Sequence, residues 1–498
     1  MNPYRIKKNP NFVGRTHEIR QIEACVSQDS ASFIIIYGRR RVGKTELIEQ
    51  FFRDRRVLKF EGLEVDEPTK TDLDRSREAQ LRDCRRRLAR YLENPLISRV
   101  ACGTWTEFFE LLDETARKQD VVLYFEEVQW LAGYHSDFFA ELKPFWDDRW
   151  RHNRRLTLVL CGSSPSFLIG QFTAGKALYA RAQLQIYLKP FALPEIKRFL
   201  PKLGNREVMQ TQLAIGGVVE YLKQLKGQGA VVPAICRKSF EPNAFFSLEF
   251  DRIFVSSLGS NRYYRRVVEA LSRRRFATAK ELEKACSGGG GGHFTDVLRD
   301  LEICGFISRY TPLHKDDNTS KLVRYNIADE YLRFYYNFIH PIRKRIAAGE
   351  YVGQPDRALN RTRFLQIQGL NFERWCRDHH HIFSRILGFH GVEYMAGPFF
   401  DRRSRETDKG FQIDLMYIIK GSKIVLCEIK YPGGPWDRNL LRAVEEKRDA
   451  FLRSQARYRD YSVETVLIVP ECPASHRSRA TFDRVITFDQ IFDDRYWE

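Results

Sequence analysis

A phosphate-binding loop is the first feature of this sequence that could do chemistry. The residues that fit its pattern, GxxxxGK[ST], are Gly38, Arg39, Arg40, Arg41, Val42, Gly43, Lys44 and Thr45. In such a loop, backbone N–H groups at the start of a helix surround a β-phosphate. We expect Lys44 to neutralise the β- and γ-phosphate oxygens and Thr45 to offer its hydroxyl to Mg²⁺. The loop therefore predicts a nucleotide-binding site.

Two adjacent carboxylates, Glu126 and Glu127, follow the apolar run VVLYF at 121–125. A hydrolytic nucleotide site needs a carboxylate at the end of a neighbouring strand to hold the magnesium shell. We assign that role to Glu126 and the orientation of the attacking water to Glu127. Because Glu126 is one methylene longer than the usual Asp, its contact with the metal should be shifted or mediated by water. The alternative is that both carboxylates form a solvated strand end.

Two further candidates lie downstream of these carboxylates. Ser163 and Ser164 follow the apolar run at 156–161, where a small polar side chain can sense a γ-phosphate. Arg181 could reach a phosphate across a subunit boundary as an arginine finger in a homo-oligomer, or it could be an ordinary surface charge.

A second chemical cluster is expected near the carboxyl end of the chain. Glu428 and Lys430 lie two residues apart in a strand-like run, so their side chains should emerge on one face. Asp414 and Glu428 could hold Mg²⁺ against a scissile phosphate, with Lys430 positioning or deprotonating the water. Glu373, on a helix that begins near Gly369, would complete the metal shell. These residue types predict phosphodiester hydrolysis, whereas the bare ExK tripeptide would also suit an exposed strand face.

Other polar residues near this cluster carry less information. Gln412, Glu446 and Lys447 are candidates for supporting the site, with surface roles as the alternative. The run His379 to His381 resembles a metal cluster, but consecutive helix positions point about 100° apart and cannot converge on one ion. We therefore expect these histidines at the surface.

Strand and helix patterns place the phosphate loop in a parallel sheet. The run SFIIIY at 32–37 predicts a strand, and the spacing of apolar residues from Glu46 predicts a helix. Continuous apolar runs at 121–125 and 156–161, separated by helical stretches at 104–118 and 137–150, suit parallel strands that are covered on both faces. The charged segment from about 66 to 100 predicts an exposed helical insertion, whose arginines face either solvent or nucleic acid.

A helical lid and a winged helix are expected in the middle of the chain. The pattern is helical from Pro190 to about 226, and from Asn261 three short helices precede two strand-like runs, which is the order of a winged helix. The glycines at 288–292 should loosen the turn into the third helix. That helix would present His293, Thr295, Asp296 and Arg299 to the major groove, and the nearby basic residues are Arg273, Arg274, Arg275 and Lys280. A winged helix can also bind protein.

The carboxyl-terminal cluster should lie on a β-hairpin. The runs at 412–419 and 423–431 flank the dipeptide Gly421-Ser422, which predicts two antiparallel strands joined by a tight turn. In that hairpin Asp414 and Glu428 lie on neighbouring strands.

Composition sets the limits of these interpretations. The 498 residues suggest about three domains, and 43% hydrophobic residues with 13% aromatics and a mean hydropathy of -0.45 exclude intrinsic disorder as the main state. The net charge of +18 and pI near 9.4 favour phosphate-bearing partners. Ten cysteines without metal or disulfide spacing, and the lack of a signal or membrane-spanning run, predict a cytoplasmic protein with no membrane partner.

Several of these motifs together resemble one family. The residues that carry the resemblance are FVGR at 12–15, the GRRRVGKT loop, EEVQ at 126–129, CGSS at 161–164, LYARA at 178–182 and IGGVVEYL at 215–222. They look like the archaeal-type P-loop ATPases, relatives of AAA+ and STAND proteins. That resemblance implies ATP and Mg²⁺ as cofactors, a winged helix, and a carboxyl-terminal domain similar to PD-(D/E)xK nucleases. Glu126 and Val219 depart from the Asp and Pro usual in the family.

The expected fold is a multidomain α/β protein. Residues 1–230 should form a P-loop NTPase parallel sheet with a helical lid, residues 231–350 a winged helix with a helical connector, and residues 351–498 a restriction-endonuclease-like α/β domain. The leading hypothesis is an ATP-regulated protein that acts on DNA, with metal-dependent nuclease activity. The alternatives are a nucleotide-switched DNA-binding or signalling regulator with an inert nuclease fold, and an ATPase that remodels a protein partner.

Overall fold

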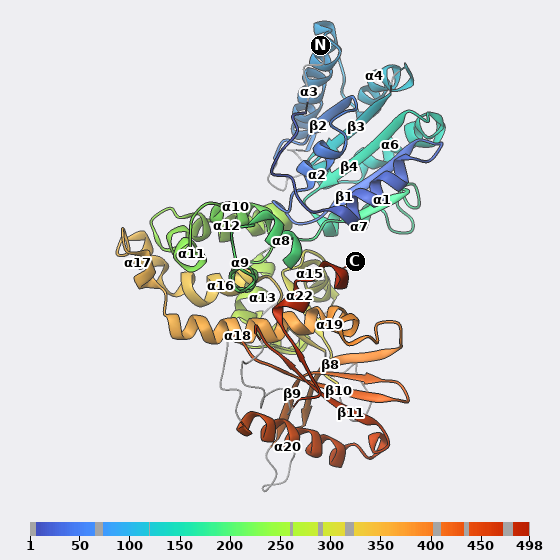
Figure 1. Ribbon diagram of the computed structural model, residues 1–498. Helices are drawn as coiled ribbons and strands as arrows, with labels where there is room; N and C mark the ends of the chain where they lie inside the picture. Colours follow the sequence, from blue (N-terminus) through green and yellow to red (C-terminus); the bar gives the residue numbers. More distant parts are fainter. Residues whose placement is uncertain are drawn as a thin grey trace.

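The protein is an elongated molecule with a parallel sheet at one end, a mixed sheet at the other and a helical middle part (Figure 1). It was obtained as a computed structural model. The described residues are 6–64, 73–118, 120–258, 262–286, 292–313, 323–401, 410–432, 438–471 and 482–497.

The amino-terminal sheet is fully parallel, as the continuous apolar runs predicted. Its strands are β1 (Ser32–Tyr37), β2 (Val57–Glu61), β3 (Val121–Glu126), β4 (Leu156–Gly162) and β5 (Leu184–Tyr187), in the order β2-β3-β4-β1-β5. Strand β1 is therefore paired on both sides, by β4 and β5. The carboxyl ends of β1 and β3, which carry the phosphate loop and Glu126, lie at one edge of this sheet.

Helices cover both faces of the parallel sheet (Figure 1). They are α1 (Thr16–Val26), α2 (Lys44–Phe51), α3 (Leu73–Tyr91), α4 (Trp105–Lys118), α5 (Val128–Leu131), α6 (Asp137–Asp148) and α7 (Pro165–Gln171), with 3₁₀ turns at Pro95–Arg99 and Trp150–His152. The expectation of an exposed insertion at 66–100 was wrong in part. Leu81, Cys84, Leu88 and Tyr91 of α3 are buried in the sheet core, because they recur at helical spacing along one face of a helix that is charged elsewhere.

The middle part is helical and ends in a small antiparallel ribbon. Its first helices are α8 (Leu193–Phe199), α9 (Asn205–Ile215), α10 (Val219–Leu225), α11 (Val231–Phe240) and α12 (Phe245–Leu258). Then follow α13 (Arg262–Ser272), α14 (Ala279–Cys286), α15 (Gly292–Ile303), β6 (Ile307–Tyr310) and β7 (Arg324–Ile327), in the predicted order of three helices and two strands. Most of the expected glycine turn, residues 287–291, lies outside the described residues.

A connector leads from the ribbon to the second sheet. It comprises α16 (Glu330–Phe334), a π-helical turn at Tyr335–Ile339, 3₁₀ turns at His340–Ile342 and Pro355–Ala358, and α17 (Arg343–Ala347). The long helix α18 (Arg361–Asp378) and α19 (His380–Leu387) then pack against the carboxyl-terminal sheet.

The carboxyl-terminal sheet is mixed. Its strands are β8 (Tyr394–Asp401), β9 (Phe411–Ile419), β10 (Lys423–Ile429), β11 (Ser462–Ile468) and β12 (Arg484–Ile486), in the order β12-β11-β10-β9-β8. Strands β8, β9 and β10 are antiparallel neighbours, whereas β10, β11 and β12 run parallel. The predicted hairpin is confirmed as β9 and β10. Helix α20 (Arg438–Ser454) connects β10 to β11, and α22 (Phe488–Ile491) and short 3₁₀ turns complete this part.

Hydrophobic packing is continuous from the helical middle part into the second sheet. One cluster of buried residues extends from Phe191 before α8 to Ile491 in α22. Across it, Asn371 of α18 donates a hydrogen bond of 2.9 Å to the carbonyl of Leu213 in α9. The domain limits at residues 230 and 350 stay predictions, and the chain shares one core across both of them.

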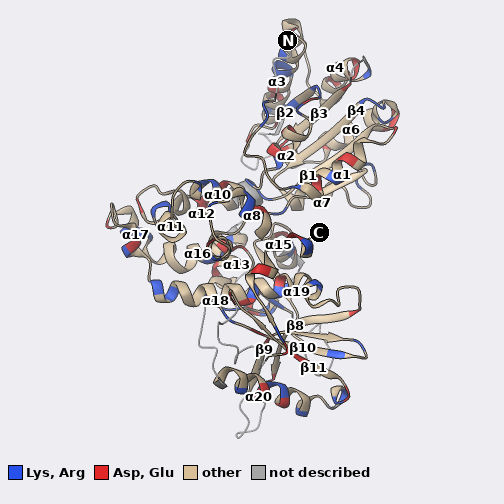
Figure 2. Cartoon of the chain, in the orientation of Figure 1, with Lys and Arg blue, Asp and Glu red and all other residues tan. Residues whose placement is uncertain are grey.

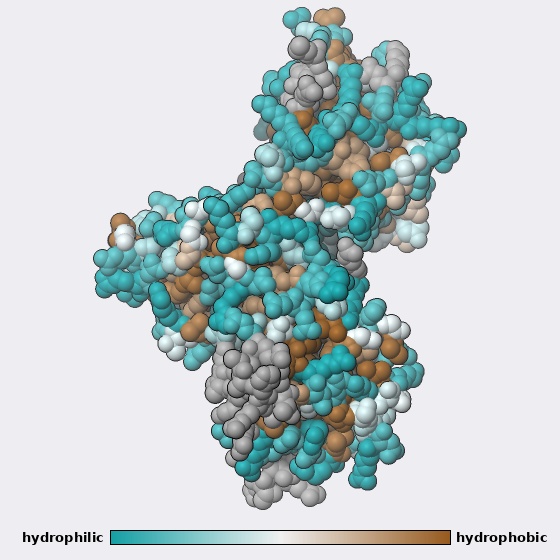
Figure 3. All heavy atoms as spheres, in the orientation of Figure 1, coloured by the Kyte–Doolittle hydropathy of each residue, from teal (hydrophilic) through white to brown (hydrophobic). Residues whose placement is uncertain are grey.

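The visible face of the molecule is mostly hydrophilic, with small scattered apolar patches (Figure 3). Within the described ranges, none of the helices combines the length and the apolar character needed to cross a bilayer. The nine cysteines that the structure describes are all buried, and none of these nine is in a disulfide.

Candidate functional site

The phosphate loop joins β1 to α2 with an unusual backbone. Gly43, which precedes α2, has φ +98°, and Arg41 has φ +72°. A Cβ added at Gly38 would collide with the carbonyl oxygen of Leu188. Side chains larger than hydrogen are therefore strained at these glycines. Lys44 Nζ donates to the carbonyls of Gly38 at 2.9 Å and Arg39 at 3.0 Å, so its ammonium lies over the loop that the motif predicts around a phosphate.

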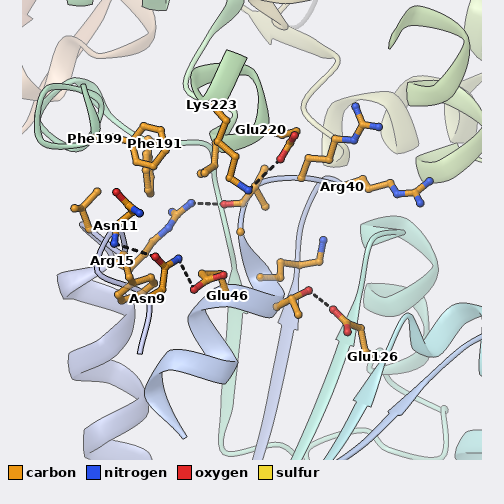
Figure 4. A pocket seen from close by; sticks show the side chains of 18 of the residues that line it. Asn9, Asn11, Arg15, Arg40, Glu46, Glu126, Phe191, Phe199, Glu220 and Lys223 are labelled. Carbon is orange, nitrogen blue, oxygen red and sulfur yellow. Dashed lines mark hydrogen bonds and ion pairs between the residues drawn. The ribbon is translucent and has the colours of Figure 1, made fainter. Parts of the chain in front are cut away.

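The predicted magnesium ligands lie side by side at the sheet edge. Thr45 Oγ1 at the start of α2 donates a hydrogen bond to Glu126 Oε1 at the end of β3 (Figure 4). Hydroxyl and carboxylate oxygens are ligands that Mg²⁺ prefers, so this pair fits the ion. The other Glu126 oxygen forms an ion pair of 2.5 Å with Lys59 of β2. Burial opposes the charge of Lys59, but the carboxylates of Glu126 and Glu49 outweigh it and raise the lysine pKa.

Lys59 is a residue of the nucleotide site that could not be identified from the sequence patterns. It lies in β2, which pairs with β3 so that Lys59 is opposite Tyr124. A single lysine in a short strand does not indicate a functional site in the sequence. Its position next to Glu126 becomes evident only when β2 is known to pair with β3. Lys59 binds one oxygen of Glu126 while the other oxygen accepts from Thr45, so the lysine helps to orient this carboxylate.

Glu127 is held in place by the residues that follow β4. Its backbone has φ +49°, and its Oε2 accepts hydrogen bonds from Ser163 N at 3.0 Å, Ser163 Oγ at 2.6 Å and Gln129 Nε2 at 2.7 Å. Ser163 is fully buried and does not line the nucleotide pocket, whereas Glu127 does. The serine predicted to sense phosphate therefore contacts Glu127, the carboxylate assigned to the water, and the roles of both residues stay predictions.

A pocket of about 690 Å³ surrounds the loop, and the helical lid supplies its other wall. Figure 4 shows Phe191 and Phe199 side by side above Arg15, with Lys223 and Glu220 of α10 facing the loop. The aromatic side chains offer an apolar wall for a base. The polar wall, formed by the loop and α10, is suited to phosphates.

Arg15 ties the loop to the lid. Its guanidinium donates to the carbonyls of Val42 at 2.8 Å and Lys189 at 2.9 Å, and it lies 4.6 Å from the centre of the Phe191 ring. The side chain is almost completely buried, and that burial lowers its pKa despite the nearby Glu195 and Glu18 carboxylates. In the sequence, Arg15 stood out only as part of the FVGR resemblance.

Two loop arginines are anchored outside the ATPase sheet. Arg39 is 6% exposed and binds Asp329, the residue that caps α16, and Arg41 binds Glu249 of α12. Tyr221 of α10 links the two pairs, since its hydroxyl accepts from Arg39 at 2.9 Å and donates to Glu249 at 3.1 Å. The loop therefore contacts the middle part through three buried groups.

The two remaining basic candidates, Arg40 and Arg181, lie at different places relative to the nucleotide pocket. Arg40 lines the nucleotide pocket, with its guanidinium 4.0 Å from Glu64 and 5.8 Å from the centre of the Trp130 ring. Arg181 lies outside that pocket and forms a 3.1 Å ion pair with Asp147 of α6. Its role at a subunit boundary stays a prediction.

The carboxyl-terminal candidates meet in one pocket of about 570 Å³. Glu373 of α18, Asp414 of β9, Glu428 of β10 and Lys430 all line it. Asp414 is 8% and Glu428 5% exposed. Lys430 Nζ lies 2.6 Å from Glu428 Oε1, and Lys447 Nζ of α20 lies 2.8 Å from Glu428 Oε2. Lys447, for which a surface role was the alternative, belongs to this pocket.

The charges of this pocket perturb one another. Burial and then the Asp414 carboxylate raise the pKa of Glu373 to about 7, and burial and then Glu428 raise the pKa of Asp414. Glu428 is also buried, but Lys447 and Lys430 outweigh that effect and lower its pKa. The two lysines thus favour the charged form of Glu428, whereas burial and a neighbouring carboxylate disfavour the charged forms of Glu373 and Asp414.

The donor set of this pocket fits a hard cation in part. Asp414 and Glu428 provide carboxylate oxygens, which suit Mg²⁺, and such sites use one or two carboxylates together with substrate phosphates. Over the described ranges, no three His, Cys, Asp or Glu side chains are grouped closely enough to hold a metal ion by themselves. Water and phosphate oxygens would therefore have to complete the coordination.

One expectation about other polar residues needs correction, that for the histidines, and the one for α15 stays a prediction. His379 and His380 are half-buried at the junction of α18 and α19, because the chain turns there and stacks the His379 ring 4.4 Å from Trp375. Burial lowers the pKa of His379 to about 4. Helix α15 packs beside α7 of the parallel sheet, where Asp296 and Arg299 form a 2.9 Å ion pair with each other. The side chain of His293 lies outside the described residues.

Comparisons with known proteins agree with the amino-terminal architecture. A family of ATPase domains found predominantly in Archaea matches residues 12–225. An uncharacterized protein of Methanocaldococcus jannaschii is 24% identical over 371 residues, which are 74% of this chain and 76% of that protein. An uncharacterized ATP-binding protein of the same organism is 44% identical over 46 residues, or 9% of this chain and 78% of that protein.

Among solved structures, a Walker-type ATPase of Pyrococcus abyssi is similar at a TM-score of 0.48 and 17% identity, covering 67% of this chain and 99% of that one. The family match covers the loop, Glu126, Glu127 and the start of the lid, all of which the parallel sheet brings to one pocket. Together with the phosphate loop and the parallel sheet, the match of residues 12–225 to that family supports a P-loop ATPase domain in this part of the chain.

Proposed function

We propose that this protein is an ATP-regulated enzyme that hydrolyses phosphodiester bonds of DNA in its carboxyl-terminal pocket. The observation that carries the proposal is the meeting of Glu373, Asp414, Glu428 and Lys430 from a helix and two strands in one cavity. These residue types match, position by position, those of the PD-(D/E)xK resemblance. The net charge of +18 favours a polyanionic substrate.

Each side chain has a distinct role in this proposal. Asp414 and Glu428 would hold Mg²⁺, which polarises the scissile phosphate and activates water when bound. Lys430 would position the water and stabilise negative charge that develops on the phosphate. Lys447, on the other oxygen of Glu428, orients that carboxylate. Glu373 would accept a hydrogen bond from a metal-held water or ligate the ion directly.

The helices and ribbon from α13 to β7 support a DNA-binding role. Their order is that of a winged helix, with Arg273, Arg274 and Arg275 exposed in the turn after α13. Exposed arginines of this kind bind the phosphates of the DNA backbone, and this part of the affinity does not depend on base sequence. This assignment rests on analogy of fold, and a winged helix can also bind protein.

Coupling between ATP and DNA would pass through Arg39 and Arg41. Asp329 follows directly after the ribbon and accepts a hydrogen bond of 2.6 Å from Leu332 N, which starts α16. Arg41 lines the nucleotide pocket, so a triphosphate bound there would compete with Glu249 for its guanidinium, and Tyr221 links Glu249 to Arg39 and Asp329. Nucleotide binding would therefore change the restraint on α12 and α16, and with it the position of the ribbon.

Replacing Asp329 with asparagine tests this coupling. The amide still caps α16 but has no negative charge to pair with Arg39. The ratio of DNA affinity with ATP to DNA affinity without it should therefore move from its wild-type value towards one. Fluorescence anisotropy of labelled DNA, with and without a non-hydrolysable ATP analogue, measures that effect. Asp493→Asn, the same change at the half-buried cap of the last 3₁₀ turn, is the control. An undiminished ATP effect in Asp329→Asn would contradict the coupling route.

The direct test of the proposed function is a cleavage assay. Full-length protein is incubated with linear and circular DNA, with Mg²⁺ or Mn²⁺, and with ATP, ADP or no nucleotide. We expect strand scission that depends on the metal and is abolished by a chelator. Absence of scission under every condition would contradict the nuclease proposal.

A second candidate function is favoured by the pairing of both Glu428 oxygens with lysines. Such a pocket could bind a phosphate without cleaving it, in a nucleotide-switched regulator whose nuclease fold is inert. Salt-dependent DNA binding without scission would identify this regulator. A lack of any salt-dependent DNA affinity would instead indicate an ATPase that remodels a protein partner.

A further inference from the structure

A cavity of about 340 Å³ between the middle part and α18 is lined by arginines that the proposed chemistry does not use. The arginines of its wall are Arg273, Arg274, Arg275, Arg333, Arg363 and Arg374. They come from the turn after α13, from α16 and from α18, so three separate elements bring like charges together. Like charges are costly to gather unless something anionic is bound there.

Carboxylates neutralise only part of this charge. Arg273 pairs with Glu269 at 2.7 Å, and Arg333 with Glu330 at 3.6 Å. Throughout the part of the chain that the structure describes, Arg275, Arg363, Arg374 and Arg377 form no ion pair with a carboxylate.

The pKa of Arg374 is lowered by burial and by the positive charges around it. Burial first, and then the positive charges of Arg333 and Arg377, lower its pKa to about 9. Its guanidinium is also tied to the turn after α13, because Nη2 donates to the carbonyl of Arg275 at 2.9 Å. Arg374 is therefore held against the turn after α13, in surroundings with an excess of positive charge.

The arginine cavity adjoins the pocket of Asp414. Arg275 and Leu370 line both cavities, and they also line a narrow hollow of about 60 Å³. Glu373 and Gln412 are shared by this hollow and the Asp414 pocket. Aromatic side chains, Phe276, Tyr310 and Phe400, flank the hollow. A groove with basic residues and interleaved aromatics leads towards the predicted catalytic residues.

One face of α18 forms the floor of this groove. Arg363, Ile367, Leu370, Arg374 and Arg377 follow one another at intervals of three or four residues, so they lie on one side of the helix. The fourteen steps of the helix from Arg363 to Arg377 correspond to about 21 Å at 1.5 Å per residue. At about 3.4 Å per nucleotide along one strand, that length matches about six phosphates. In Figure 2 basic residues are visible along α18.

We infer that the groove from Arg363 to Arg377 binds the phosphodiester backbone of a nucleic-acid strand and guides it into the Asp414 pocket. The inference rests on the proposed function, since it takes nucleic acid as the ligand, and it adds the route of the strand. The turn after α13 then contacts the same strand as α18, so the middle part and the second sheet bind one substrate together. This route differs from the major-groove position expected for α15.

The test measures DNA affinity of the full chain by fluorescence anisotropy over a range of salt concentrations. The variants are Arg275→Ala and Arg363→Ala, singly and combined, because both side chains are exposed and their loss should leave folding intact. We expect the double variant to bind about tenfold or more weakly at moderate salt and to reduce the slope of log affinity against log salt by about two. Arg357→Ala, at an exposed arginine of the connector, should bind as the wild type does.

Charge-conserving variants separate this role from a structural one. Arg275→Lys and Arg363→Lys should keep most of the affinity and the salt slope, because a phosphate contact mainly needs the charge. Equal melting temperatures of wild type and alanine variants check that folding is unchanged. Unchanged affinity and salt slope in the double alanine variant would overturn the groove, as would loss of affinity in Arg357→Ala to the same extent.

Failure of the groove and failure of the proposed function give different results. If the wild type cleaves DNA and the double alanine variant binds and cleaves equally well, the groove is wrong and the nuclease proposal stands. If the wild type binds DNA through these arginines but never cleaves it, the groove stands and the nuclease proposal is wrong.

Discussion

Replacing Lys44 with alanine should abolish ATP binding at micromolar concentrations and stop ATP hydrolysis. The ammonium is expected to contact two phosphate oxygens, and each charge-assisted hydrogen bond contributes about 1.5–3 kcal/mol. Losing both corresponds to about 10²–10⁴-fold weaker binding. Turnover should also fall by about 10²–10³-fold at saturation, since the same charge stabilises the transferring phosphate. Titration calorimetry and a phosphate-release assay measure the two effects.

A second lysine of the same pocket provides the control for Lys44. Lys223 of α10 lines the pocket and pairs with Glu220 at 3.1 Å. Because its charge is already engaged by that carboxylate, Lys223→Ala should weaken ATP binding by less than about tenfold. Wild-type ATP affinity in Lys44→Ala would refute the assignment of the phosphate loop. An equal loss in both variants would show that net charge, and not the loop, determines binding.

Replacing Asp414 with asparagine should reduce DNA cleavage by about 10³-fold or more while DNA affinity stays near its wild-type value. The substitution keeps the shape of the side chain but removes a charged metal ligand, and a bound metal contributes several kcal/mol to such a reaction. Lys430→Met should lower the cleavage rate similarly, because the charge next to Glu428 would be lost. Rates of scission under single-turnover conditions, at increasing Mg²⁺, measure both effects.

The same Asp→Asn substitution outside the pocket is the control for effects on folding or on overall charge. Asp449 lies on the same unit, in α20, and pairs with Arg448 at 3.1 Å at the surface. Asp449→Asn should therefore cleave at the wild-type rate. Cleavage by Asp414→Asn at that same rate would show that scission comes from another site or from a contaminating nuclease. A lower rate that high Mg²⁺ restores would support the role of Asp414 as a ligand.

The phosphate loop and the carboxyl-terminal hairpin were both predictable, because each is encoded by a short stretch of chain. A strand, a glycine-containing loop and a helix that starts with Lys44 need only neighbouring residues to form. Likewise, Gly421-Ser422 between two apolar runs specifies the hairpin that puts Asp414 beside Glu428. Continuous apolar runs also predicted the parallel sheet, since only strands covered on both faces are apolar at successive positions.

The partners of these groups could not be predicted in the same way. Lys59 reaches Glu126 only because β2 pairs with β3, and Ser163 reaches Glu127 only because β4 lies on the other side of β3. Lys447 approaches Glu428 because α20 crosses one face of the second sheet. Each of these contacts joins residues distant in the chain, and the single side chains involved carry no pattern that a sequence can display.

The sequence by itself determined the chemical groups of two sites and the local elements that hold them, through motifs whose geometry is contained within a few residues. Only the tertiary structure decided that loop arginines bind Asp329 and Glu249, and that arginines from three elements converge beside the Asp414 pocket. The physical reason is that burial of apolar surface sets how helices and sheets pack, and this packing assigns neighbours to charged groups irrespective of their distance along the chain.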